Sequence, residues 1–191
     1  GLSPELLQAV EAAGYTEPTP IQAEAIPQVQ MMRDLIGIAQ DTGFKTAKTY
    51  LASGNLVLWG EHEGGAALER ALEDALEARM GLRTDFMVRS PAQLRAIIDG
   101  NPYRAEAVDH PSHVIVNFLK SPLPAEDEAI LRAAITGPER FAVGARELYL
   151  DFPISIADSV LDRDWKKTKR SPVGTTRNWN TVMALAGMMD A

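Results

Sequence analysis

Residues 31–59 read MMRDLIGIAQDTGFKTAKTYLASGNLVLW, and the way this stretch folds decides the rest of the chain. In its first half, Gly43, Lys45 and Thr46 follow one another in an order found in phosphate-binding loops. In its second half, Leu, Val and aromatic residues from Lys48 to Trp59 predict a buried strand after a helix that ends near Gly43. The second interpretation is the stronger one, and it predicts the start of an α+β domain.

The composition is that of an ordinary globular domain. The chain has 191 residues, of which 46% are hydrophobic and 24% charged, and its net charge is -7. There is no cysteine, which excludes thiolate metal sites and a cysteine nucleophile. No apolar run is long enough for a membrane span, and Gly1-Leu-Ser-Pro lacks the features of a signal peptide. We therefore expect a cytoplasmic protein with no membrane partner.

Helical and strand patterns follow one another along most of the chain. They favour α+β architecture over a doubly wound sheet. Two short helices are expected within residues 1–30. Further on, we expect a helix at 68–80 ended by Gly81, a strand near 83–89, a helix capped by Ser90-Pro91, a strand at 114–119 and a helix from Pro124 to Ala134. A hairpin of 141–143 with 148–152, joined by a type II′ turn at Gly144-Ala145, and a last helix from Trp179 complete the chain.

The N-terminal residues carry a motif with specific spacing. It consists of Leu2-Ser-Pro-Glu-Leu-Leu, Gly14-Tyr15, Pro18-Thr-Pro-Ile-Gln22, Ala25-Ile-Pro27 and Arg33-Asp-Leu-Ile-Gly-Ile-Ala-Gln40. Residues 1–40 thus resemble the N-terminal Q-motif fragment of DEAD-box RNA helicases. The resemblance implies that Gln22 reads an adenine edge, with Lys45 and Thr46 at the phosphates of ATP with magnesium.

The phosphate loop departs from the helicase pattern. Thr42 and Phe44 stand where that family has glycines, and no Asp-Glu-Ala-Asp box follows. Glycines let successive backbone amides approach the phosphates, and a phenylalanine ring would fill that space. We therefore expect a degenerate loop, no bound cofactor and no ATP hydrolysis. A buried Phe44 would mark the loop as a packed helix end.

A second set of motifs spans residues 31–191. It comprises Met32-Arg-Asp-Leu, Asp41-Thr-Gly-Phe44, Thr49-Tyr-Leu-Ala-Ser-Gly-Asn-Leu-Val57, Asn101-Pro-Tyr103, Glu139-Arg-Phe-Ala-Val143, Arg146-Glu-Leu-Tyr-Leu150 and Thr176-Arg-Asn-Trp-Asn-Thr-Val182. These residues resemble the domain-of-unknown-function 1697 family. The resemblance implies ferredoxin-like α/β sandwich pieces and supplies no catalytic residue.

Members of that family usually begin with a strand where this chain has the helicase-like residues 1–30. The sequence therefore predicts a chimera, engineered or recombined, in which an N-terminal helical segment is joined to an α+β domain at 31–191. Losing a strand leaves its neighbour with unpaired backbone groups. We expect residues 1–30 to cover that edge in a monomer; a homodimer through the edge is the alternative.

Two stretches are candidate binding sites. The first is Ser53, Gly54 and Asn55, where a glycine inside a strand pattern indicates either an anion site or a structural turn stabilised by Asn55. The second is a basic segment at 162–179 with a net charge of +4, flanked by Trp165 and Trp179. It suits either nucleic-acid phosphates or a solvated loop over the core. Its cations are Arg163, Lys166, Lys167, Lys169, Arg170 and Arg177.

No catalytic or metal pattern is present. His62, His110 and His113 match no metal-ligand spacing. Four carboxylates, Glu69, Glu73, Asp74 and Glu77, are expected on the solvated face of their helix. We therefore predict a non-enzyme. The alternative is a weak nucleotide- or nucleic-acid-binding module, and a third possibility, an unrecognised small enzyme, has no residue to support it.

Overall fold

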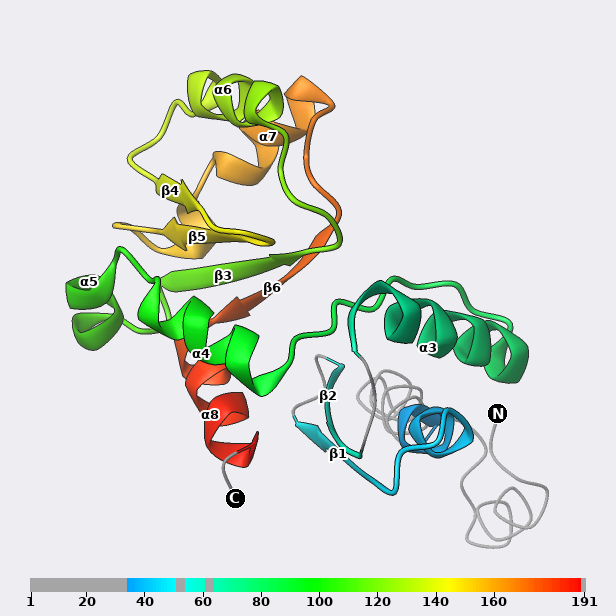
Figure 1. Ribbon diagram of the computed structural model, residues 1–191. Helices are drawn as coiled ribbons and strands as arrows, with labels where there is room; N and C mark the ends of the chain where they lie inside the picture. The colour runs from blue at the N-terminus through cyan, green and yellow to red at the C-terminus, as the bar shows by residue number, and fades with distance from the viewer. Residues whose placement is uncertain (1–33, 51–53, 61–63, 190–191) are drawn as a thin grey trace, which may run out of the picture. The chain divides into compact units, whose positions relative to one another are not determined.

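The computed structural model describes residues 34–50, 54–60 and 64–189, which divide into two units of separate packing (Figure 1). One unit holds the described residues up to 60 together with 75–82. The other holds 64–74 and 83–189. Residues 1–30 lie outside the described residues, so the expected helical segment and the boundary at residue 30 stay predictions.

A helix and a hairpin form the first unit. Residues 34–41 are helical, and strands β1 (Thr46–Tyr50) and β2 (Asn55–Trp59) pair antiparallel. The predicted single strand at 48–59 is therefore wrong. The chain reverses at Gly54, whose φ is +75°, and Tyr50 faces Asn55 across the hairpin. The buried hydrophobic residues of this unit are Leu35, Ile38, Ala39, Phe44, Val57 and Leu76.

Helix α3 (Gly65–Met80) contributes residues to both units and ends as the sequence predicts. Gly81 has a φ of +66°, and its amide donates to the carbonyl of Glu77 at 2.8 Å. A glycine adopts this left-handed conformation without the steric cost that a Cβ would add. The helix therefore stops at Gly81.

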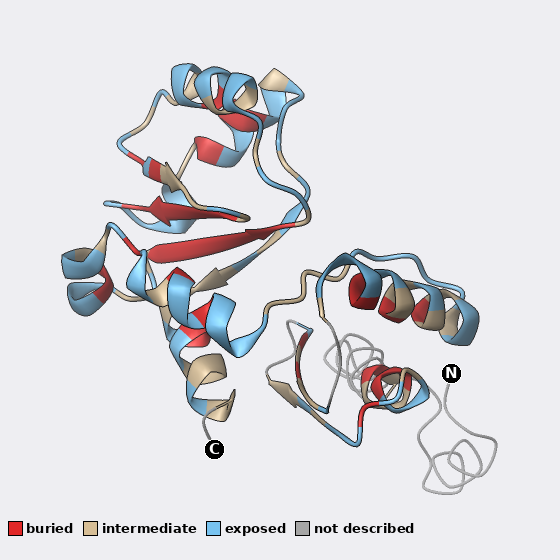
Figure 2. Ribbon diagram, in the orientation of Figure 1, coloured by how far each residue is buried: buried red, intermediate tan, exposed pale blue. Residues whose placement is uncertain are grey.

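The second unit is built on a four-stranded antiparallel sheet in the order β4-β5-β3-β6. Its strands are β4 (Arg140–Val143), β5 (Glu147–Asp151), β3 (Val114–Leu119) and β6 (Gly174–Asn178). Strand β3 lies in the middle and is buried along its length (Figure 2). This antiparallel sheet with separate helices confirms the predicted α+β class.

Helices cover both faces of this sheet (Figure 1). Ile115 and Leu119 belong to a core shared with α6 and α7, whereas Val116 and Phe118 belong to a core shared with α4 and α8. The alternation follows from the two-residue period of a strand. The helices of this unit are α4 (Pro91–Asp99), α5 (Arg104–Asp109), α6 (Ala125–Ala134), α7 (Leu161–Thr168) and α8 (Trp179–Met189), with a short 3₁₀ helix at Ile156–Asp158.

Residues 83–89 were expected to form a strand, and that prediction is wrong. The amide of Phe86 donates to the carboxylate of Glu73 at 2.8 Å, and that of Val88 donates to Glu69 at 2.9 Å. Carboxylates of α3 thus accept hydrogen bonds from amides that would otherwise donate to a neighbouring strand. The sequence of the segment has a strand pattern, but the segment belongs to neither sheet of the described residues.

The β4–β5 hairpin is present, but its predicted turn is not. A type II′ turn needs a positive φ at Gly144, and Gly144 is not among the positive-φ glycines. Instead, the amide of Gly144 donates to the carbonyl of Glu147 at 2.8 Å. The Glu147 carboxylate then accepts the amides of Ala145 at 3.0 Å and Arg146 at 3.1 Å. A buried carboxylate therefore fixes the loop.

Candidate functional site

A cleft lies between α4 and the β4–β5 hairpin, with a volume of about 360 Å³. Helix α4 lines it with Gln93, Ala96 and Ile97, followed by Gly100, and the hairpin lines it with residues 143–147 and Tyr149. Arg89, which precedes the helix, completes the lining. All these residues belong to the second unit. The volume falls in the range typical of small-molecule sites.

A capping box fixes the start of α4 beside the cleft. The Ser90 hydroxyl accepts the amide of Gln93 at 3.2 Å, and the Gln93 side chain accepts the amide of Ser90 at 2.9 Å. Both bonds satisfy amides that have no acceptor within the helix. The wall of the cleft that carries Gln93 and Ala96 is therefore well anchored.

Tyr149 joins the sheet to this helix. Its hydroxyl donates to the carbonyl of Ile97 at 2.9 Å. Burial, with the nearby charge of Glu147, raises the pKa of Tyr149 to about 12. The phenol therefore keeps its proton at neutral pH, so it can hold α4 in place but cannot act there as a base.

Arg89 is one of the two arginines that line the cleft, the other being Arg146. Its guanidinium donates to the carbonyls of Val88 at 2.9 Å, Leu119 at 3.0 Å and Arg146. It also lies 5.6 Å from the ring centroid of Phe118. Burial, followed by the charge of Arg146, lowers the pKa of Arg89 from its ordinary value. The nearby charges of Glu147 and Glu69 act in the opposite direction and offset part of this lowering of the pKa.

Glu69 pairs with Arg146 and Lys120 and is almost completely buried, with 1% of its side chain exposed. It accepts from Arg146 at 2.8 Å, lies 3.3 Å from Lys120, and accepts the amide of Val88. Burial raises the pKa of Glu69, but the bonds from Arg146 and Val88 outweigh it and the pKa is lowered overall. Glu69 is therefore an ionised buried carboxylate.

The prediction that Glu69 lies on a solvated helix face is wrong. A signal for its burial was present, because residues 69, 72 and 76 recur at helical spacing, and Leu72 and Leu76 are buried. Glu73, one turn further on, is also partly buried and pairs with Lys120. Arg89, Arg146 and Tyr149 were missed because no local sequence pattern marks them.

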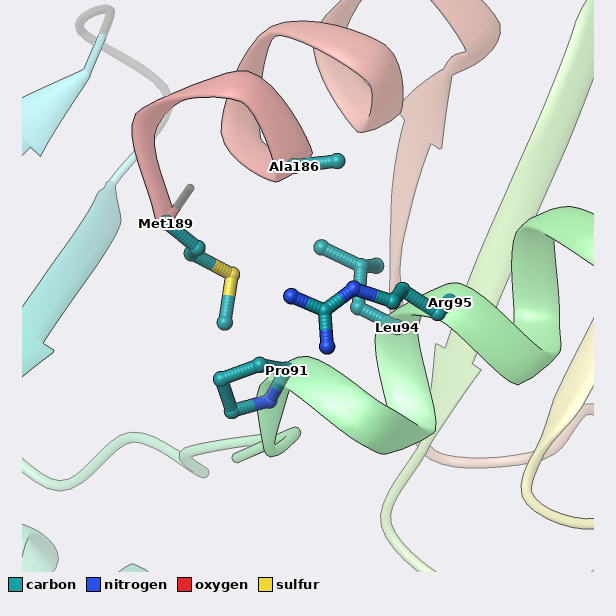
Figure 3. Close-up of a pocket in the computed structure, with 5 residues that line it drawn as sticks. All are labelled: Pro91, Leu94, Arg95, Ala186 and Met189. Carbon is teal, nitrogen blue, oxygen red and sulfur yellow. The ribbon is translucent and has the colours of Figure 1, made fainter. Parts of the chain in front are cut away.

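A second, much smaller hollow lies between α4 and α8, with a volume of about 10 Å³. Figure 3 shows the guanidinium of Arg95 pointing toward Pro91 and Met189. Such a volume holds about one water molecule. This hollow is therefore not a ligand site.

The stretch that resembles a phosphate-binding loop is a helix end, as the stronger interpretation of residues 31–59 predicts. The amides of Thr42, Gly43 and Phe44 donate to the carbonyls of Ile38, Gln40 and Ala39, each at 3.0 Å. The Thr42 hydroxyl donates to the carbonyls of Ile38 and Ala39 at the same helix end. The Phe44 side chain is 6% exposed. Amides committed in this way cannot cradle a phosphate.

Of the other residues predicted to bind a nucleotide, the structure describes Lys45 and Thr46 but not Gln22. Lys45 and Thr46 are exposed, and Thr46 opens β1 rather than a helix. A phosphate-binding loop uses the N-terminus of the helix that follows it, and here a strand follows. Gln22 lies outside the described residues, so its predicted role stays untested.

The Ser53-Gly54-Asn55 stretch is a hairpin turn in its described part. The Asn55 side chain is buried, and its amide nitrogen donates to the carbonyl of Tyr50 at 2.8 Å. This is the structural alternative that the sequence left open. Ser53 lies outside the described residues.

Several cations of the basic segment form ion pairs with nearby carboxylates. Lys166 pairs with Asp162 at 2.6 Å, Lys167 with Asp164 at 3.3 Å, and Arg170 with Asp127 at 3.0 Å. Arg163 also contacts Asp164, Arg177 donates to the Thr175 hydroxyl from within β6, and exposed Lys169 has a left-handed φ of 56° at the end of α7.

The tryptophans of that segment face the core. Trp165 is 6% exposed, packs edge-on against Phe141 with ring centroids 5.2 Å apart, and donates to the carbonyl of Leu131 at 3.2 Å. Trp179 packs against the opposite core. A buried ring cannot stack on a nucleic-acid base, so this arrangement fits the alternative of a solvated segment over the core.

Metal and membrane features were searched across the described residues. Within 34–50, 54–60 and 64–189, no group of three or more His, Asp or Glu side chains is arranged to hold a metal ion. The rings of His110 and His113 lie 5.6 Å apart, and His113 Nδ1 is 3.0 Å from the carbonyl of Phe152. None of the described helices has the length and apolarity to cross a membrane.

The fold is that of an α+β protein, in which helices cover both faces of a four-stranded antiparallel sheet. Residues 27–149 match the family described as "Protein of unknown function (DUF1697)", which covers more than half of the chain. The chain belongs to this family, as its motifs predict.

A solved structure supports the same fold. The chain is similar to the conserved bacterial protein SP0830 from Streptococcus pneumoniae, with a TM-score of 0.66 and 17% sequence identity. The match covers 84% of this chain and 89% of that one. At this identity the likeness speaks for the fold alone.

Part of the chain is also similar to RNA helicases. It is 38% identical over 98 residues to the ATP-dependent rRNA helicase RRP3 of Debaryomyces hansenii, covering 46% of this chain and 20% of that protein. It is 56% identical over 46 residues to DEAD-box ATP-dependent RNA helicase 21 of Oryza sativa subsp. japonica, covering 24% of this chain and 6% of that protein. The chain therefore spans at most about a fifth of these helicases.

Proposed function

We propose that the chain is a binding module rather than an enzyme, and that it binds its ligand in the cleft between α4 and the β4–β5 hairpin. The observation that carries this proposal is the cleft itself, about 360 Å³ with Arg89 and Arg146 in its lining. Two guanidiniums supply hydrogen-bond donors, while alanine, isoleucine and valine side chains supply apolar surface.

The titratable groups of the cleft support binding more than catalysis. Glu147 is engaged with the amides of Ala145 and Arg146, and Tyr149 keeps its proton because its pKa is about 12. Tyr149 is therefore not poised to exchange a proton near neutral pH. No nucleophile paired with a base lines this part of the described chain.

The test uses one variant that fills the cleft and one that does not. Ala96 lines the cleft, whereas Ala92 lies on the same helix outside it, and both are exposed. We would record backbone amide NMR spectra of Ala96→Phe and Ala92→Phe with a mixture of small aromatic acids, amides and amines. Shifts at Gly100, Gly144 and Ala145 that disappear only in Ala96→Phe are expected. Shifts confined to other regions, or kept in Ala96→Phe, would refute a binding role for the cleft.

The alternative function is weak nucleotide binding through Gln22, Lys45 and Thr46. The helicase relatives are named as ATP-dependent, which motivates the idea. What opposes it is the engagement of the Thr42, Gly43 and Phe44 amides with the preceding helix. We expect no ATP hydrolysis, and no heat on titration with ATP-magnesium or AMP. Micromolar binding lost in Gln22→Ala would establish the alternative.

We also propose that the chain is a chimera of residues 1–40 of helicase type and an α+β domain at 31–191, and that it is a monomer. The family match from residue 27 and the short helicase matches support a junction. Backbone NMR shifts should show helices within 4–13 and 20–26, and a strand there would contradict it. Light scattering that finds a dimer at micromolar concentration would favour pairing through an unpaired strand edge instead.

A further inference from the structure

We propose that the ligand of the cleft is a small organic anion whose charged group meets Arg89 and whose apolar part lies along Ala96 and Val143. This inference rests on the proposed function, because it names the ligand class of the same cleft. It is argued from the partners of Arg89, from the nearby carboxylates and from the apolar lining.

Arg89 has donors to spare. A guanidinium carries five N–H groups. In the described chain, those of Arg89 bond the carbonyls of Val88, Leu119 and Arg146, which use three of them at most. None of these acceptors carries a full charge. The charges of Glu147 and Glu69 act on Arg89 from nearby, but its hydrogen bonds go to neutral carbonyls. Such a guanidinium gains a charge-assisted hydrogen bond when an anion accepts from it.

The carboxylates close to the cleft are already engaged. Glu147 accepts the two loop amides of Ala145 and Arg146. Glu69 accepts from Arg146 and from the amide of Val88, with Lys120 beside it. The positive charges of Arg89 and Arg146 are thus matched by the negative charges of Glu147 and Glu69. The oxygens of these two carboxylates, however, accept hydrogen bonds from donors other than Arg89. Arg146 also keeps its Nε buried with no partner in the described structure.

The rest of the lining indicates what the anion is attached to. Ala96, Ile97, Val143 and Ala145 present methyl and aliphatic groups, and the space of about 360 Å³ far exceeds an inorganic ion. Gly100 has little room for a side chain, because a Cβ there would lie 3.0 Å from the Tyr149 hydroxyl. An anion with an apolar body matches both parts of the cleft better than a bare ion or a neutral molecule.

The experiment uses three probes of equal shape and different charge. Benzoate is an anion, benzamide is its neutral counterpart and benzamidine is its cationic counterpart. Each would be titrated into the full chain at neutral pH, with the backbone amides of Gly100, Gly144 and Ala145 followed by NMR. Benzoate should bind in the millimolar range or tighter, at least tenfold more tightly than benzamide, with benzamidine weakest, and its affinity should fall as salt is added.

Two variants and a control locate the effect. Arg89→Met should abolish the preference for benzoate over benzamide. Because Arg89 also holds the hairpin carbonyl of Arg146, Ala96→Phe provides an independent block that leaves every described hydrogen bond of Arg89 in place. Arg95→Met is the control, since Arg95 lies on the same helix and lines the other hollow. It should retain benzoate binding within about twofold of the unmodified chain.

The outcomes separate the ligand class from the binding role. If benzamide binds the cleft as tightly as benzoate, the anion proposal falls while the binding function stands. If none of the three probes moves the cleft amides, and the fragment mixture does not either, both fall. If benzoate binding is unchanged in Arg89→Met and Ala96→Phe, the anion site lies elsewhere and the proposal is overturned, whatever the result with Arg95→Met.

Discussion

Glu69 and Arg146 are 77 positions apart in sequence and form an ion pair of 2.8 Å, in which the Glu69 side chain is 1% exposed. The pair joins α3 to the β4–β5 loop. Through the carbonyl of Arg146, Arg89 is tied to the same loop. The cleft therefore rests on a charged network that connects three distant segments of the second unit.

Removing the Glu69 charge should destabilise the second unit. Glu69→Gln leaves Arg146 and Lys120 without their buried carboxylate, and we expect the free energy of unfolding to fall by about 2 kcal/mol. Urea denaturation followed by the fluorescence of buried Trp165 measures it. Asp74→Asn, an exposed change on the same helix, should stay within about 0.5 kcal/mol. Equal effects of the two substitutions would rule out a special role for Glu69.

The same residue should contribute to acid sensitivity. Its pKa is lowered in the folded state, so its stabilising effect is fully present above its unfolded pKa of about 4.3 and is lost as pH falls through the folded value. The unmodified chain should therefore lose stability below about pH 4 more steeply than Glu69→Gln. Parallel stability curves for the two proteins would contradict this.

Asp164 should titrate at unusually low pH. The hydroxyl of Thr136 donates to its carboxylate, and despite opposing burial this bond, with Lys167 and the Thr136 amide, lowers the pKa of Asp164 to about 2. Its contribution is present above the ordinary value of 3.8 and disappears as pH falls toward 2. Carboxyl carbon NMR should give that midpoint, and Thr136→Val should raise it. An unshifted midpoint in Thr136→Val would mean that this hydroxyl is not the cause.

Phe44 should be a core residue of the first unit. Its side chain is 6% exposed and packs against Gly60, where an added Cβ would lie 3.2 Å from the ring. Phe44→Ala should cost about 3 kcal/mol of unfolding free energy. Leu82→Ala, at a position 49% exposed, is the matched control and should cost far less. If Phe44→Ala instead leaves stability unchanged and gains ATP binding, the loop is a disabled phosphate site rather than a helix end.

The basic segment should bind single-stranded RNA weakly or not at all. Lys166, Lys167 and Arg170 are paired with neighbouring carboxylates, and Trp165 is buried. Fluorescence anisotropy with labelled RNA should show no binding at about 50 mM salt, a condition that favours phosphate contacts. Binding that weakens steeply with salt and is reduced in Lys166→Gln would contradict this expectation.

Much of the second unit follows from the sequence. Strand β3 is predicted by the apolar residues between Val114 and Leu119, which only Asn117 interrupts, and α4 by Ser90-Pro91. Predictions from local sequence are wrong where the side chain of a distant residue forms hydrogen bonds with the backbone. Residues 83–89 have a strand pattern, but Glu69 and Glu73 take the amides of Val88 and Phe86. Strand β6 is also missed, because its threonines become a strand only by pairing with β3.

The candidate site was beyond sequence reasoning for a physical reason. Arg89 and Arg146 are 57 positions apart, and they meet only when α4 packs on the sheet that contains the β4–β5 hairpin. The turn at Gly54 shows the opposite case, since its structural alternative could be stated from Gly54 and Asn55 alone. Local sequence patterns thus predict some turns and helix caps, but they do not show which distant side chains converge.

The measurement that tests the central claim most directly is a crystal structure of the full chain soaked with benzoate. The account predicts benzoate in the cleft between α4 and the β4–β5 hairpin, with its carboxylate within hydrogen-bond distance of the Arg89 guanidinium and its ring along Ala96. An empty cleft at saturating benzoate, or benzoate bound only elsewhere on the chain, would contradict it.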